Sequence, residues 1–261
     1  MTFARFALAA CLAGAGMSAH SAGVKSLVLA DCCFGGTTLD AVRLDLIGSD
    51  ARFDQANSAS LSLMHGLPTL ATLSQYDSVL VFTDSVSVSA YDLSNLLGTY
   101  VQGGGRVVLS TFWGATAGTA GGLINSSGFN PLTAPRIDPY HADTLGAYNA
   151  ADPLMQGVAS LSASNFRGDY EVGLDAGATL AASWSDGRPL AAYNAARSVV
   201  AITLNPNVVT YFNASGDYAH LFANSLAMTG AVPEPQTYAL MFAGLALVGG
   251  VAARRRKSAA A

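Results

Sequence analysis

Short apolar runs alternate with amphipathic segments in the first half of the chain, and this alternation restricts the fold more than any other feature. The runs are Ser26–Ala30, Ser78–Thr83 and Arg106–Ser110. Such continuous apolar runs are typical of strands that are buried on both faces of a parallel sheet. Ser89 and Asp92, between the second and third runs, have the spacing of a helix-capping pair. The sequence therefore predicts an α/β domain with a mainly parallel sheet and helices on both faces.

Other segments of the first half fit this pattern. Thr37 or Thr38 can cap a helix whose apolar residues recur on one face; these are Leu39, Val42, Leu46 and Ile47. Residues 52–55 are predicted to form the second strand. The glycines at 103–105 are predicted to end the helix that begins near Ser89.

The second half of the chain has a different character. Residues 178–184 and 189–193 are strand-like and are joined by Ser185-Asp186-Gly187-Arg188, which is typical of a hairpin. A further strand is predicted over residues 198–204 and a closing helix over residues 217–228. We therefore expect an antiparallel hairpin extension of the parallel sheet. The Gly- and Ala-rich stretch 114–135 is predicted to be a long loop, which could be a flap over a site.

The order of these segments resembles that of the class I glutamine amidotransferase-like superfamily, which has a flavodoxin-like sheet. The segments that carry the resemblance are Tyr76-Asp77-Ser78-Val79-Leu80-Val81, Tyr100-Val101-Gln102-Gly103-Gly104-Gly105-Arg106-Val107-Val108, Asp152-Pro153-Leu154-Met155-Gln156-Gly157-Val158 and the Asp186-Gly187 hairpin. Catalytic members of that superfamily have a cysteine nucleophile in a sharp turn after a central strand. The matching segment here is Thr111-Phe112-Trp113-Gly114, which has no cysteine.

The other parts of the amidotransferase machinery are also missing. Ser110 is a hydroxyl alternative beside Thr111, but no Gly-x-Ser-x-Gly elbow surrounds it. Glu171 is the one glutamate between the two ends of the chain, so the expected His-x-Glu pair is absent. We therefore predict no amidotransferase activity and assign no catalytic residue.

Ligands of open α/β sheets bind beyond the carboxyl ends of the strands. Several side chains that could contact a ligand follow the predicted strands, and His141 lies in a predicted loop. The ligand-binding candidates are Asp31, Cys32, Cys33, Asp84, Trp113 and His141. Asp31 and Asp84 could instead cap the helices that follow them, or together hold a hard cation.

The adjacent pair Cys32-Cys33 leaves three interpretations open. It could form a vicinal disulfide that offers a flat surface to a sugar, it could supply a nucleophilic thiol, or it could be a buried pair at a strand end. The histidines His65, His141 and His220 lack metal-ligand spacing, so no metal site and no cofactor are predicted.

The C-terminal end of the chain has the pattern of a membrane-directed segment. Residues 237–253 contain no charged side chain and are followed by Arg254-Arg255-Arg256-Lys257. At about 1.5 Å per residue this run reaches the lower limit for a transmembrane helix. The cations would place the C-terminus in the cytoplasm and the preceding chain on the other side of the membrane.

The order of parts from Pro233-Glu234-Pro235 to the arginine cluster resembles the PEP-CTERM sorting signal of exported bacterial proteins. The resemblance covers residues 232–261 and implies membrane anchoring followed by cleavage by an exosortase near the Pro-Glu-Pro triplet. A permanent anchor, serving transport or signalling, is the other use of such a helix.

The N-terminal end has the form of a signal peptide. Arg5 precedes an apolar stretch from Phe6 to Met17, and small residues around Ala19–Ala22 suit signal peptidase. We therefore expect a leader over residues 1–22, one exported domain over residues 23–231, and the sorting signal over residues 232–261.

Removal of both ends changes the charge of the protein. Five of the 13 basic residues and one of the 17 acidic residues lie in these ends, so the central domain carries a net charge of −8 and the whole chain −4. An acidic domain without a basic cluster is not expected to bind nucleic acid.

Together these features predict an exported envelope or extracellular-matrix protein whose α/β domain binds a ligand or glycan without catalysis. Exopolysaccharide and biofilm material are the expected surroundings, and signal peptidase and exosortase are the expected partners. The alternative is a surface hydrolase or carbohydrate-processing enzyme on an amidotransferase-like scaffold, which would use Asp31, Asp84 and either Cys33 or His141.

Overall fold

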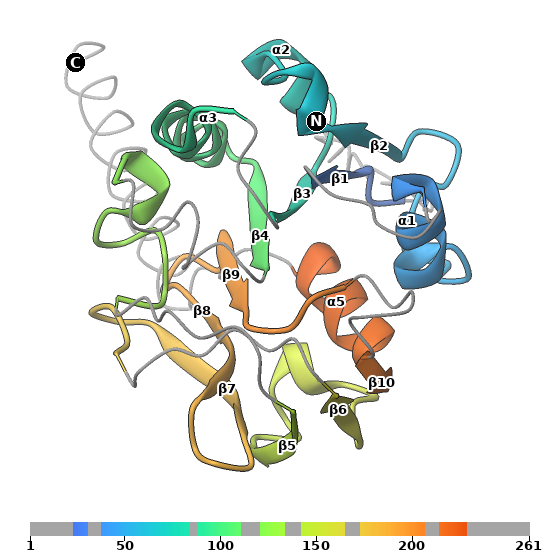
Figure 1. The fold of residues 1–261 in the computed structure, drawn as a ribbon, viewed down its shortest axis with the longest axis vertical. Helices are drawn as coiled ribbons and strands as arrows, with labels where there is room; N and C mark the ends of the chain where they lie inside the picture. Colours follow the sequence, from blue (N-terminus) through green and yellow to red (C-terminus); the bar gives the residue numbers. More distant parts are fainter. Residues whose placement is uncertain are drawn as a thin grey trace, which may run out of the picture.

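The computed structural model describes residues 23–30, 38–83, 88–110, 121–133, 142–164, 173–206 and 214–228. These residues form one mixed sheet of ten strands with helices packed against it (Figure 1). The strands are β1 (Ser26–Ala30), β2 (Ala59–Ser62), β3 (Ser78–Phe82), β4 (Arg106–Ser110), β5 (Asp143–Tyr148), β6 (Leu161–Ala163), β7 (Thr179–Trp184), β8 (Pro189–Tyr193), β9 (Val199–Ile202) and β10 (Ala214–Gly216). The helices are α1 (Leu39–Ile47), η1 (Leu63–His65), α2 (Leu70–Leu73), α3 (Ala90–Gln102), η3 (Leu123–Asn125), η4 (Pro153–Met155) and α5 (Tyr218–Ala227).

The sheet has a parallel half and an antiparallel half. Strands β2, β1, β3, β4 and β9 are neighbours in that order and are all parallel. This is the strand order of flavodoxin-like folds. Strands β8, β7, β5, β6 and β10 continue the sheet with antiparallel pairing. The predicted α/β class is confirmed, and the antiparallel extension is larger than the predicted hairpin.

Helices cover both faces of the parallel half, as the apolar runs require. Val28 and Leu80 point to the side of α1 and α5, where they join one hydrophobic core. Leu27 and Val79 point to the opposite side and join a second core with α2 and α3. Each strand therefore supplies apolar side chains alternately to two cores, and this arrangement explains why the runs have no polar alternation.

The predicted helix ends are confirmed. Thr38 is the N-cap of α1, and its side chain accepts a hydrogen bond from the backbone N–H of Ala41. Ser89 caps α3 in the same way through the backbone N–H of Asp92. Helix α3 ends at Gln102, immediately before the three glycines.

The prediction of a strand over residues 52–55 is wrong. The second strand is β2, and the earlier segment contributes one isolated bridge between Val24 and Phe53. The Asp50 carboxylate accepts hydrogen bonds from the backbone N–H and the guanidinium of Arg52, which holds this segment in a turn. Strand β2 is half-buried and alternates apolar and small polar residues, so it lacks the continuous apolar run of the other strands.

Part of the predicted loop over residues 114–135 is packed against the domain. Ile124 in η3 is buried in the second core, and Leu123 contacts Gly98 of α3. A Cβ atom at position 98 would lie 2.5 Å from the Leu123 Cγ atom, so glycine allows this close approach. The described part of the segment therefore supports α3 and does not form a flap.

The predicted transmembrane helix over residues 237–253 lies outside the described residues. Among the residues that are described, none of the helices combines the length and the apolar character needed to cross a membrane.

Replacement of a fully buried leucine tests the second core. We expect Leu97→Ala to lower the free energy of unfolding by about 2–5 kcal/mol, because it removes buried methyl groups and leaves a cavity. Leu44→Ala is the matched control, since Leu44 lies on α1 and is 53% exposed. Urea unfolding measures both variants, and equal effects would contradict the described packing.

Candidate functional site

The structure does not place the six ligand-binding candidates. Asp31, Cys32, Cys33, Asp84, Trp113 and His141 all lie outside the described residues. The strands before five of them are described, and β1, β3 and β4 are parallel neighbours. The segments that follow these three strands therefore begin at one edge of the sheet, which we call the carboxyl edge. The sequence correctly identified this common edge, and the site itself stays a prediction.

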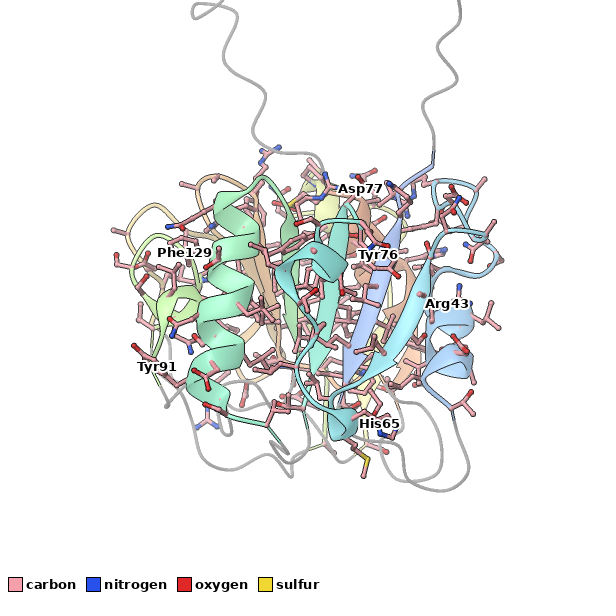
Figure 2. The ribbon with its side chains drawn as sticks, turned by 90° about the horizontal axis from the view of Figure 1, so that it is seen from above. Arg43, His65, Tyr76, Asp77, Tyr91 and Phe129 are labelled. Carbon is pink, nitrogen blue, oxygen red and sulfur yellow. The ribbon has the colours of Figure 1, made fainter. Side chains whose placement is uncertain are left out.

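Two exposed side chains that the sequence did not assign to a site lie at the carboxyl edge. His65 is the last residue of η1, which directly follows β2, and Tyr91 is in the first turn of α3. Figure 2 shows both at the end of the domain opposite Asp77, which precedes β3. The sequence analysis missed His65 because it predicted the second strand at residues 52–55. Only a strand that ends at Ser62 brings this histidine to the carboxyl edge.

The hydroxyl groups at the strand ends have structural roles or are buried. Ser110 is 2% exposed, and its hydroxyl donates a hydrogen bond to the backbone carbonyl of Leu204. Thr83 after β3 is also buried. A nucleophile must reach a substrate and have a base beside it, and Ser110 meets neither condition within the described part of the chain.

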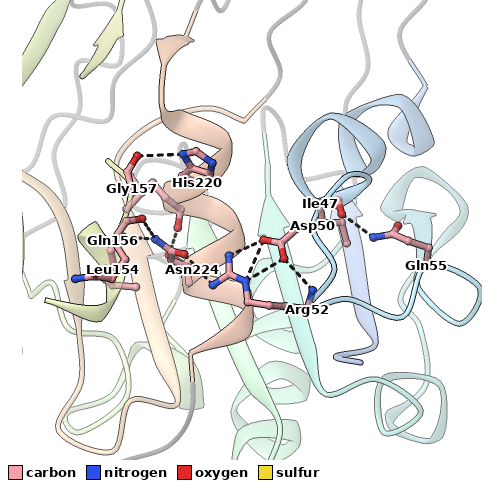
Figure 3. A network of polar contacts seen from close by, with 11 residues as sticks. Ile47, Asp50, Arg52, Gln55, Leu154, Gln156, Gly157, His220 and Asn224 are labelled. Atoms are coloured by element: carbon pink, nitrogen blue, oxygen red, sulfur yellow. Dashed lines mark hydrogen bonds and ion pairs between the residues drawn. The ribbon is translucent and has the colours of Figure 1, made fainter. Parts of the chain in front are cut away.

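A polar network of Asp50, Arg52 and Asn224 joins the turn after α1 to α5, the last described helix (Figure 3). We call it the α1–α5 network. Asn224 of α5 accepts a hydrogen bond from Arg52 Nη1 at 2.9 Å. Its amide group donates to the backbone carbonyls of Leu154 at 3.0 Å and Gln156 at 2.7 Å. One buried amide thus connects three segments that are far apart in sequence.

Arg52 is fixed from its other side by Asp50. The closest contact, between Arg52 Nη2 and Asp50 Oδ2, is 2.6 Å. Hydrogen bonding by the Arg52 side chain holds the pKa of Asp50 below its usual value, despite the opposing effect of partial burial. The Asp50 carboxylate is therefore an ionised structural partner and is a poor candidate for a general acid or base near neutral pH.

His220 belongs to the same side of the domain and also has a structural partner. Its Nδ1 atom lies 3.0 Å from the backbone carbonyl oxygen of Gly157. A cavity of about 330 Å³ beside it is also lined by Asp45 and Asp50. Asp45 accepts a hydrogen bond from the Tyr218 hydroxyl at 2.6 Å, so both carboxylates already have partners. No group of three metal-ligating side chains occurs among the residues that the structure describes.

A groove of about 460 Å³ crosses strands β5, β6 and β10 at the antiparallel end of the sheet. Thr144, Ser162 and Ser215 are register partners on these three strands and place a row of hydroxyl groups in the groove. The hydroxyls of Ser162 and Ser215 are 2.7 Å apart. Tyr148, which is 40% exposed, also lines the groove, and none of the described lining residues is charged.

A smaller cavity of about 270 Å³ lies at the opposite end of the parallel strands, which we call the amino edge. Asp77, Tyr100 and Arg106 line it. The Tyr100 hydroxyl donates to the backbone carbonyl of Tyr76 at 3.0 Å, and burial raises the pKa of Tyr100 to about 12. The Arg106 Nε atom is buried without a hydrogen-bond partner among the described residues. This cavity suits polar groups better than an apolar ligand.

The sequence comparisons identify the end of the chain. Residues 231–257 match the family model described as the PEP-CTERM protein-sorting motif. The match covers the Pro-Glu-Pro triplet, the apolar run and the arginine cluster, so the predicted sorting signal is confirmed. Among curated proteins, no sequence matches the chain.

The structure comparisons concern the domain. A ThuA-like protein from Parabacteroides merdae is 13% identical, with a TM-score of 0.52 over 81% of this chain and 94% of that one. A second ThuA-like protein, from Bacteroides uniformis, is 11% identical with a TM-score of 0.49 over 78% of this chain and 91% of that one. A glutamine amidotransferase from Thermotoga maritima is 10% identical with a TM-score of 0.43 over 69% and 75% of the two chains. At these identities the similarity concerns the fold alone.

The α1–α5 network provides a test of its structural role. We expect Asn224→Ala to lower the free energy of unfolding by about 2 kcal/mol or more, because two backbone carbonyl groups and Arg52 lose their partner. Asn57→Ala is the control, since Asn57 is exposed and bonds only locally to Asp54. Thermal unfolding measures both variants, and a neutral Asn224→Ala would refute the role of the network.

Proposed function

We propose that this protein is exported, held at the membrane by its C-terminal segment and then released to the cell surface by an exosortase. The sorting motif at residues 231–257 carries this proposal. The motif begins just beyond Met228, the last described residue, which is buried in the first core. The domain boundaries at residues 22/23 and 231/232 and cleavage of the leader by signal peptidase are part of the same proposal.

We further propose that the α/β domain binds a ligand and does not catalyse a reaction. Three observations support this view. The Thr111-Phe112-Trp113-Gly114 segment has no cysteine, and the hydroxyl of Ser110 donates a hydrogen bond to the backbone carbonyl of Leu204. The polar side chains of the α1–α5 network bond to one another or to the backbone, which is typical of a scaffold.

A neutral glycan of the surrounding exopolysaccharide is the ligand class that we propose. The groove across β5, β6 and β10 offers hydroxyl groups for hydrogen bonding and the exposed ring of Tyr148. Aromatic rings with a polar tip suit surfaces that are partly apolar and partly wet, such as the face of a sugar. Charged lining groups, which would favour an ionic ligand, are absent from the groove as described.

The carboxyl edge supports the second candidate function, a surface hydrolase or carbohydrate-processing enzyme. His65 lies at the edge where Asp31 and Asp84 follow their strands. A histidine within reach of a carboxylate or of Cys33 would supply a base. In this case His65 would join the site formed by the candidates Asp31, Cys32, Cys33, Asp84, Trp113 and His141.

The sorting proposal predicts the mature C-terminus. Mass spectrometry of surface material should recover peptides that end near Pro233, and peptides from residues 254–257 should be missing. Replacement of Pro233, Glu234 and Pro235 by alanine should retain the full chain in the membrane fraction, because exosortase would lose its recognition sequence. Leu44→Ala is the control, since it changes an exposed side chain of the domain and leaves the motif intact. Recovery of the uncut tail from surface material would refute processing.

The glycan proposal predicts a difference between two exposed tyrosines. Tyr148→Ala should weaken binding of the processed protein to neutral exopolysaccharide about tenfold, which equals about 1.4 kcal/mol. Tyr91→Ala is the matched control, because Tyr91 is 55% exposed and lies at the carboxyl edge. Affinity electrophoresis in polysaccharide gels measures both. Weaker binding by Tyr91→Ala alone would contradict the groove as the binding site and indicate a site at the carboxyl edge.

A further inference from the structure

The two described ends of the chain lie at the same edge of the domain. Gly23 precedes β1, and the backbone of Val24 pairs with Arg52 and Asp54 at the amino edge. Because α1 connects two parallel strands, it must run from the carboxyl edge back to the amino edge. Contacts of α5 with α1 and with the turn after it therefore reveal the direction in which α5 runs.

Helix α5 runs in the same direction as α1. Tyr218, at the start of α5, bonds to Asp45 within α1, and Asn224 further along bonds to Arg52 beyond the end of α1. Met228 therefore ends α5 on the side of the amino edge. The carboxyl edge, with His65 and Tyr91, is at the other end of the domain (Figure 2).

The chain between the domain and the predicted transmembrane run is short. Eight residues, 229–236, separate Met228 from Thr237. Even a fully extended segment of this length spans at most about 30 Å. Such a short connection favours contact between the bilayer and the amino edge, from which the chain leaves. The carboxyl edge would have to turn toward the bilayer against this short connection.

The charges of the described side chains also distinguish the two edges. At the amino edge the described cations are Lys25, Arg52, Arg106 and Arg197, and the described acids that reach the surface are Asp50, Asp54, Asp77 and Asp175. Asp152 also lies at this edge, but it is buried and accepts a hydrogen bond from the Tyr193 hydroxyl. At the carboxyl edge and the β7–β8 hairpin the described acids are Asp40, Asp92, Asp143 and Asp186, and the described cations are Arg43, which pairs with Asp40, and Arg188. Counted over these described side chains, the amino edge is close to neutral, whereas the opposite edge has two more acids than cations.

We propose that the amino edge faces the lipid surface in the membrane-held precursor, so that the carboxyl edge points away from the membrane. This inference rests on the proposed function, since it requires the C-terminal segment to insert. Anionic lipid headgroups attract basic side chains within about a Debye length and repel acidic ones. Chain reach and charge therefore favour the same orientation, in which a ligand or partner has free access to the carboxyl edge.

Energy transfer from the protein to the lipid surface tests this orientation. The full chain, with its three cysteines replaced by serine, is inserted into vesicles of phosphatidylcholine and phosphatidylglycerol that carry a headgroup-linked acceptor dye. A donor dye is attached either at Gln75→Cys, beside Lys25 at the amino edge, or at Met64→Cys, at the carboxyl edge. Both positions are exposed.

The Gln75→Cys variant should show at least about twofold higher transfer efficiency, because a five-residue strand separates the two edges by about 17 Å. Equal transfer, or higher transfer from Met64→Cys, in vesicles that carry the protein on flotation would overturn the orientation alone. Failure of both variants to float with vesicles would overturn membrane insertion, and with it the proposed function and this inference. The two failures are therefore distinguishable.

Discussion

Parallel pairing of β1 with both β2 and β3 is the constraint on which the rest of the structure depends. Parallel neighbours cannot be joined by tight turns, so each connection must cross a face of the sheet and return to the amino edge. These crossings bring α1 to one face and α2 to the other, and they bury both faces of β1. The same rule sorts the connecting segments into two sets, one at each edge. The positions available for a ligand and for the chain ends therefore follow from the pairing of one strand.

The sequence revealed this half of the fold because burial on both faces produces a readable pattern. Strands β1, β3 and β4 were predicted within one residue, since each is a continuous apolar run. Strand β2 was missed because it is half-buried and its Ala-Ser-Leu-Ser sequence resembles a loop. Strands β5, β6 and β10 were missed for a related reason. Their order in the sheet depends on pairing with distant strands, and β10 pairs with β6 through three residues.

The contacts that matter most for the candidate sites could not be predicted from sequence patterns. Arg52 and Asn224 are 172 positions apart, and neither lies in a motif. The hydroxyl row of the groove becomes visible only when Thr144, Ser162 and Ser215 are placed side by side by strand register. By contrast, the sorting motif was predictable because recognition of a processing signal depends on a local order of residue types. Local signals can be read along the chain, whereas the pairing of distant polar groups requires the fold.

The position of the last helix determines what cleavage near Pro233 would leave behind. Leu221, Phe222 and Leu226 of α5 are fully buried in the first core, and Met228 completes that contact. The Pro-Glu-Pro triplet begins five positions after Met228, so removal of the segment beyond it takes no described residue from the core. A cut before Met228 would instead remove buried apolar surface and expose the α1 side of the sheet. The end of the described fold and the start of the sorting motif are thus placed so that release from the membrane need not cost the domain its stability.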